Sequence, residues 1–179
     1  MGGEFDQKNS FDESVWTKIP RGTSDWNNYM SYYDSCYAMQ DGNLILRGIA
    51  NHTQKNDTAP YLTGGVYTKG KKLFTGGRVE IRAKLQAAKG AWPAIWMLPE
   101  KAEWPKGGEI DIMEVLGDKT DTAHGTLHLG NPTPRIREPT SWRKEIFLMN
   151  IMYSPVNGNP VKSVFMIDGD LSYSSEMVF

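Results

Sequence analysis

The chain has 179 residues, enough for one domain, and its 20 lysine and arginine residues nearly balance 21 aspartate and glutamate residues. This balance, together with the lack of a long basic cluster, leaves no electrostatic footprint for nucleic acid, so we expect no nucleic-acid partner. No apolar run approaches the roughly 18 residues of a membrane span, and the N-terminus lacks the basic and apolar regions of a signal peptide.

Short runs of strand-forming residues are separated by glycine, proline and asparagine, and no segment keeps a helical period. This pattern predicts an all-β sandwich or barrel. The predicted strands cover residues 42–49, 63–70, 77–85, 91–98, 109–115, 123–129 and 163–169. No internal repeat, linker or break in composition marks a second domain, so we expect a single domain over residues 1–179.

The clearest alternation lies in residues 77–85, "GRVEIRAKL". Arginine, glutamate and lysine occupy every second position, and aliphatic residues occupy the positions between them. Side chains alternate between the two faces of a strand, so this segment predicts a sheet with one polar face and one buried face.

The segment "GGEIDIMEVLG", residues 107–117, breaks this rule. Strict alternation would place Glu114 on the face of Ile110 and Ile112, where an unpaired carboxylate costs several kcal/mol. One extra residue near Ile112 and Met113 would move Glu114 to the other face. We therefore predict a β-bulge at this point.

With this bulge, Glu109, Asp111 and Glu114 share one face of a strand. Glycosidases use paired carboxylates as acid, base and nucleophile, and two long glutamate side chains leaning together favour the short separation of a retaining mechanism. Two other interpretations remain open for an acidic strand of this kind, a solvated edge face and a set of calcium ligands.

Six tryptophans and eight tyrosines are many for a chain of this length. Trp92 and Trp96 are four positions apart, so they share a face of an extended segment, and Trp104 precedes the acidic motif. Aromatic rings in such positions either fill a sandwich core or stack on sugar rings. Their position beside carboxylates favours a carbohydrate site.

The segment "HGTLHLG" places His124, Thr126 and His128 on one face of the next predicted strand. His128 is expected near the acids and the leaving sugar. A zinc pair formed by His124 and His128 is an alternative, although the sequence offers no clear third ligand.

Four segments together resemble glycoside hydrolase family 16, and most closely its laminarinase branch: "GRVEIRAKL", "GAWPAIWMLP", "GGEIDIMEVLG" and "HGTLHLG". The E-x-D-x-x-E spacing is the bulged form of the family signature. The resemblance covers about residues 4–130 and weakens after residue 140, where family members continue through further strands. It therefore implies a chain incomplete at its C-terminus, whose unpaired edges would favour dimerisation or strand exchange.

The resemblance implies a β-jelly-roll sandwich of two antiparallel sheets with a concave substrate cleft. It also implies retaining endo-hydrolysis of β-1,3-glucan or mixed-linkage β-1,3-1,4-glucan, a polysaccharide substrate. Glu109 would be the nucleophile, Asp111 would assist it, and Glu114 would act as general acid and then base. The residues expected to line sugar subsites are Trp92, Trp96, Trp104, Arg82, His128 and Asn28.

The family requires no cofactor, but many members hold a structural calcium ion, to which Glu4 and the backbone of Gly42 would contribute here. The resemblance also implies a secreted, cell-surface or periplasmic location. Alternatives are hydrolysis of agarose- or porphyran-type galactans, a non-catalytic glucan-binding protein on the same scaffold, and a purely structural sandwich.

Overall fold

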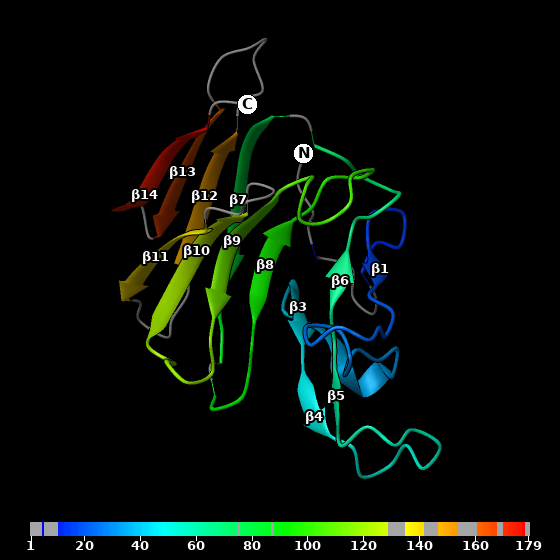
Figure 1. Cartoon of the computed structure of the whole chain (residues 1–179). Helices are drawn as coiled ribbons and strands as arrows, with labels where there is room; N and C mark the ends of the chain where they lie inside the picture. Colours follow the sequence, from blue (N-terminus) through cyan, green and yellow to red (C-terminus); the bar gives the residue numbers. More distant parts are fainter. Residues whose placement is uncertain are drawn as a thin grey trace. The chain divides into compact units, whose positions relative to one another are not determined.

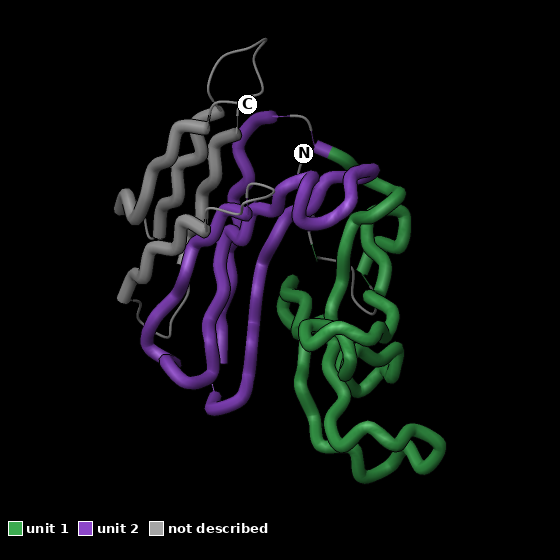
Figure 2. Tube along the Cα trace, in the orientation of Figure 1, with its two compact units in different colours: residues 1–73 green, residues 74–179 purple. Residues whose placement is uncertain are grey.

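The structure is a computed structural model that describes residue 5, residues 11–74, 76–86 and 88–128, and the backbone of four later strands. The described chain is built from antiparallel strand pairs and one short 3-10 helix. Among these residues, no helix has the length and apolar character needed to cross a bilayer. The chain divides into two compact units, residues 1–73 and residues 74–179 (Figure 2). Our expectation of a single domain stays a prediction.

The first unit contains short strands that pair as β1 with β6, β2 with β3 and β4 with β5. Asp41 and Gly42 link β2 to β3, and both have positive φ angles, of 51° and 72°. This backbone matches the two-residue hairpin turns that favour Asp-Gly. The elements of this unit are β1 (Thr17–Lys18), the 3-10 helix η1 (Asp34–Cys36), β2 (Tyr37–Gln40), β3 (Asn43–Leu46), β4 (Gly48–Ala50), β5 (Tyr61–Thr63) and β6 (Val66–Tyr67).

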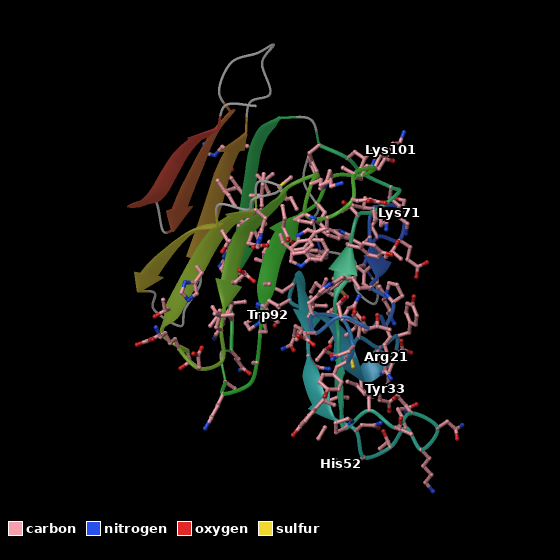
Figure 3. The ribbon with its side chains drawn as sticks, viewed as in Figure 1. Arg21, Tyr33, His52, Lys71, Trp92 and Lys101 are labelled. Carbon is pink, nitrogen blue, oxygen red and sulfur yellow. The ribbon has the colours of Figure 1, made fainter. Side chains whose placement is uncertain are left out.

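A loop between β4 and β5 is fixed by side-chain contacts. The Asn51 amide donates to the carbonyl oxygens of Asp57 (2.8 Å) and Ala59 (2.9 Å). Arg21, labelled in Figure 3, donates to both carboxylate oxygens of Asp57 at 2.6 and 2.7 Å. The Arg21 guanidinium and the Ala59 N–H hold the pKa of Asp57 below its usual value. This bidentate pair is the best-defined ion pair of the first unit.

The second unit contains two four-stranded sheets, in the orders β11-β10-β9-β8 and β14-β13-β12-β7 (Figure 1). Every strand pair in both sheets is antiparallel. The strands are β7 (Gly77–Ala83), β8 (Ala94–Met97), β9 (Glu109–Val115), β10 (Thr122–His128), β11 (Arg135–Ser141), β12 (Phe147–Tyr153), β13 (Val161–Ile167) and β14 (Asp170–Met177).

The core of the second unit lies on one face of β9 and β10. Its buried members include Val115, Ala123 and Leu127, and Val79 and Ile81 of β7 pack against them. The positions between the aliphatic residues of β7 are exposed. The alternation predicted for this strand is therefore confirmed, and it turns the aliphatic face of β7 toward the core.

The predicted strands correspond to described strands, although several boundaries differ. The segment predicted at 63–70 contains the last residue of β5 and the two residues of β6, and the one at 91–98 contains only the four residues of β8. The sequence pattern missed β1, β2, β5, β11, β12 and β14. Their residues do not alternate clearly between polar and apolar. They form strands because the fold places a pairing strand beside each of them. Dimerisation or strand exchange stays a prediction.

Candidate active site

The predicted bulge is present in β9. On the β8 side, Ile95 pairs with Met113 and Trp96 pairs with Asp111, so Ile112 is the additional residue. On the β10 side the register also shifts, between His124 and Thr126. Two residues of β9 therefore oppose one residue of each neighbouring strand, which is how a β-bulge is defined.

The bulge brings the three acids to one face of the sheet. Directly opposite residues of an antiparallel pair share a face, and β10 pairs His128 with Glu109, Thr126 with Asp111 and His124 with Glu114. These three residues of β10 occupy alternate positions of their strand. Glu114 therefore lies with the other two acids, on the face opposite the core, as predicted.

The two glycines before the acids have separate structural reasons. At Gly107, an added Cβ would lie 2.4 Å from the Cβ of Ala102, so a side chain would collide with the preceding turn. Gly108 has a φ of 81°, in the region that favours glycine. Gly107 N–H also donates to the Glu103 carbonyl at 2.9 Å. This tight turn carries Trp104 back toward the first acid.

Trp92 reaches the site because residues 90–93 run beside the end of β9. The Val115 N–H donates to the Pro93 carbonyl at 3.0 Å. At Gly117, an added Cβ would lie 2.4 Å from the Gly90 nitrogen, so only glycine permits this approach. Trp92, labelled in Figure 3, is thus held next to the last acid of the motif.

Glu114 is buried, with 6% of its surface exposed, and each of its carboxylate oxygens has a hydrogen-bond donor within reach. The Trp92 indole N–H donates to Oε1 at 3.0 Å. The Thr126 hydroxyl lies 3.3 Å from Oε2. A buried carboxylate needs such partners because it has lost its contact with water.

A second set of contacts joins Glu109, Asp111 and His128. The Trp104 indole N–H donates to Glu109 Oε2 at 2.7 Å. His128 Nε2 lies 2.9 Å from Asp111 Oδ2 and 3.8 Å from Glu109 Oε2. The Trp104 ring also packs at a tilt against the His128 ring, with a centroid distance of 6.0 Å. His128 therefore links the two carboxylates, as expected for a residue near the acids.

Metal binding gains little support at this face. Ligand atoms of Glu109, Asp111 and His128 lie within 4.8 Å of one another, but the hydrogen bond between His128 and Asp111 already gives them a role, and we assign no metal there. His124 and His128 are four positions apart on a regular strand, about 13 Å at 3.3 Å per residue. That separation is too long for the zinc pair considered from sequence.

The structure brings together most of the predicted site residues. Trp96 faces the same side, because it pairs with Asp111. Arg82 does not join them. It lies in the other sheet, on the exposed side of β7 opposite the aliphatic residues that pack on the core, and its subsite role stays a prediction. Strand alternation alone could not show which sheet β7 would enter.

Three predicted residues belong to the first unit, residues 1–73. Asn28 is partly buried there, and its side-chain oxygen has no hydrogen-bond partner among the described residues. Gly42 occupies the turn between β2 and β3 and offers one carbonyl, while Glu4 lies outside the described residues. The subsite role of Asn28 and the calcium site stay predictions.

Two further residues of the site are not among the catalytic or subsite residues predicted from the sequence. Thr126 is fully buried and contacts Glu114, and His124 is buried opposite Glu114. The alternation of "HGTLH" places them on the correct face. The sequence contains no signal for the two indole contacts, because they depend on turns that bring Trp92 and Trp104 back to β9.

The chain matches the family model described as "XgeA-like, catalytic GH16 domain" over residues 34–153, more than half of its length. It is 44% identical over 135 residues to a keratan-sulfate endo-1,4-beta-galactosidase of Sphingobacterium multivorum, covering 73% of this chain and 31% of that protein. It is 37% identical over 133 residues to a beta-glucanase of Rhodothermus marinus, covering 70% of this chain and 46% of that protein. The chain thus spans less than half the length of these curated relatives.

The fold also resembles a solved structure, the laminarinase from Rhodothermus marinus. The TM-score is 0.82 and the identity 29%, over 96% of this chain and 71% of that one. Together with the antiparallel sheets, this likeness confirms the predicted all-β jelly-roll class.

Proposed function

This chain belongs to glycoside hydrolase family 16, and we propose on that premise that it is an endo-acting retaining glycosidase that cleaves β-1,3- or mixed-linkage β-1,3-1,4-glucan. The observation that carries the proposal is the bulge in β9. It places all three acids of the E-x-D-x-x-E motif on one face, each beside a hydrogen-bonding partner.

In the first step, Glu109 attacks the anomeric carbon while Glu114 donates its proton to the glycosidic oxygen. The bond between the carbon and that oxygen breaks, and a glycosyl–Glu109 ester forms. In the second step, Glu114 takes a proton from water, the water oxygen bonds to the anomeric carbon, and Glu109 leaves as a carboxylate. Two displacements on opposite faces of the sugar retain its configuration.

Asp111 and His128 support the nucleophile in this scheme. An ionised Asp111 can only accept a hydrogen bond, so His128 donates Nε2–H across the 2.9 Å contact. The imidazole is then fixed 3.8 Å from Glu109 Oε2, where it limits the approach of water to the nucleophile. The half-exposed rings of Trp92 and Trp104 offer faces on which sugar rings can stack.

The similarity to a beta-glucanase and a laminarinase supports a β-glucan as substrate. A poly-β-galactoside is a second candidate. It is favoured by the 44% identity to a keratan-sulfate endo-1,4-beta-galactosidase, and it agrees with the galactan alternative considered from sequence. Both substrates are neutral at the scissile bond and require the same two carboxylates.

The experiment is to incubate the protein with laminarin, barley mixed-linkage glucan, agarose and keratan sulfate and to measure new reducing ends. We expect release from a β-glucan, and a loss of at least about 10³-fold in the Glu109→Gln variant. Release from keratan sulfate or agarose alone would show that the substrate is a galactan and not a β-glucan. No release from any polymer would favour the non-catalytic glucan-binding protein.

Secretion or display at the cell surface or in the periplasm is part of the proposal, because a polysaccharide substrate of this size is met outside the cytoplasm. A structural calcium ion bound by Glu4 and Gly42 is also proposed. Loss of thermal stability on treatment with a chelator, restored by added calcium, would support it.

A further inference from the structure

Two tryptophans contact the two proposed catalytic glutamates through their indole N–H groups. Trp92 donates to Glu114 at 3.0 Å, and Trp104 donates to Glu109 at 2.7 Å. Both rings remain about half exposed, at 48% and 57%. Each indole therefore has its polar edge on a carboxylate and part of its apolar face available to a sugar.

We propose that Trp92 and Trp104 are positioning residues that act through these N–H groups, one on the acid/base and one on the nucleophile. The inference rests on the proposed function, since it assigns a task to side chains that hold its two carboxylates. It goes beyond sugar stacking, because the indole edge selects which carboxylate oxygen is free to react.

At Glu114 the indole selects the oxygen that carries the proton. An indole N–H is a donor only, and the hydroxyl oxygen of a protonated carboxyl group is a poor acceptor. The Trp92 N–H therefore keeps Oε1 as the carbonyl-type oxygen, and the proton of the acid form lies on Oε2. The Thr126 hydroxyl, 3.3 Å from Oε2, can accept from the protonated form and donate to the ionised form.

At Glu109 the indole selects the attacking oxygen. The Trp104 N–H and His128 Nε2 both lie on the side of Oε2. Among the described residues, Oε1 makes no hydrogen bond. Oε1 is therefore the oxygen free to attack the anomeric carbon, while Oε2 is held in place by the donor.

The test replaces each indole by a ring without an N–H, in Trp92→Phe and Trp104→Phe. Two substrates of the same glycone are compared. The first is the polymer that the wild type cleaves, whose leaving alcohol needs a proton. The second is a 2,4-dinitrophenyl glycoside of the oligosaccharide that the wild type releases, whose leaving group departs without a proton. Melting temperatures check that both variants fold.

Trp92→Phe should lower kcat/KM on the polymer by about tenfold to a hundredfold, through kcat, because a hydrogen bond to a charged group is lost while the aromatic face stays. On the aryl glycoside the same variant should lose no more than about threefold, because acid assistance is not needed there. Trp104→Phe should lower kcat/KM on both substrates by about tenfold, because both need the nucleophile.

Equal losses on the two substrates in Trp92→Phe would overturn the assignment to the acid/base and leave a stacking role. Unchanged kinetics in either variant would overturn the role of that N–H group. These results concern the inference alone, since the wild type would still be a glycosidase. A wild type that cleaves no polymer would instead overturn the proposed function, and this inference with it.

Discussion

β7 and β9 are both seven-residue strands of the second unit (Figure 1), and both carry charged residues, but the charged side chains of the two strands lie in different surroundings. In β7 the charged residues are exposed, and Glu80 forms an ion pair with its neighbour Arg78. In β9 the acids Asp111 and Glu114 are buried, with 4% and 6% of their surface exposed. The charged side chains of the regular strand are exposed to water, whereas the buried acids of the bulged strand contact hydrogen-bonding groups of the protein.

This difference shows why a strand can hold buried carboxylates. Regular pleating fixes one face for every second residue, so one face of β7 suits the core and the other suits solvent. The additional residue in β9 lets Ile112 and Met113 both enter the core and returns Glu114 to the face of Asp111. There the donors of the neighbouring strand and turns replace water.

The strongest test of the comparison deletes one isoleucine from each strand. Deleting Ile81 from β7 would turn Arg82 toward the core, and an unpaired buried charge costs several kcal/mol, enough to unfold the second unit. Deleting Ile112 from β9 removes the bulge but leaves Glu114 two positions after Asp111, on the same face. We expect a loss of about 2–4 kcal/mol from the lost core side chain, with hydrolysis retained.

Urea unfolding followed by circular dichroism measures the stability of both deletions, and reducing-end release measures the activity. The Ile112 deletion could instead fold but lose the contacts of Glu114 and all activity. The bulge would then have a catalytic role beyond turning Glu114 to the face of Asp111.

The next largest effect is expected from removing the carboxylate of Glu114, with the same substitution at Glu80 as the control. Glu114→Gln should lower kcat/KM on the polymer by about 10²- to 10⁴-fold, the usual contribution of general acid catalysis. Glu80→Gln should change it by less than about twofold, because Glu80 is exposed in the other sheet. A similar loss in both variants would contradict the assignment of Glu114.

A smaller effect is expected at Thr126, which is fully buried on the face of β10 that meets the acids. Thr126→Val keeps the shape but removes the hydroxyl from Glu114 Oε2, so we expect kcat/KM to fall about tenfold. Thr126→Ser keeps the hydroxyl and should lose no more than about threefold. Equal losses in the two variants would point to packing of the methyl group as the reason for threonine.

The smallest effect concerns a charge outside the site. The pKa of Asp57 is lowered in the folded state, first by its hydrogen bond with Arg21, so its ionised form stabilises the fold. That stabilisation is present above the unfolded pKa of about 3.9 and is lost as the pH falls through the lower folded value. Asp57→Asn should lower Tm by no more than a few degrees at pH 7.

The difference in Tm between Asp57→Asn and the wild type should shrink as the pH is lowered below about 4. Asp25→Asn is the control, since Asp25 is exposed and forms no ion pair within the described part of the chain. A difference that stayed constant down to pH 2 would show that the carboxylate charge of Asp57 is not the cause.

Much of the second unit could be predicted from local pattern. The alternation of residues 77–85 predicted β7, and the misplaced Glu114 predicted the bulge, because burial of an unpaired charge is costly enough to constrain the backbone. The positions of β11 and β12 could not be predicted in the same way. Their residues alternate weakly, and they become strands through pairing with β10 and β7.

The sequence by itself determined the all-β class, the acid motif and the common face of Glu109, Asp111 and Glu114, since these follow from residue spacing and strand pleating. Only the tertiary structure decided which groups meet those acids. The indole of Trp92 and the ring of His128 reach them through turns and strand register, and Arg82 is carried to another sheet. Such contacts join residues distant along the chain, and local spacing does not determine their distance in space.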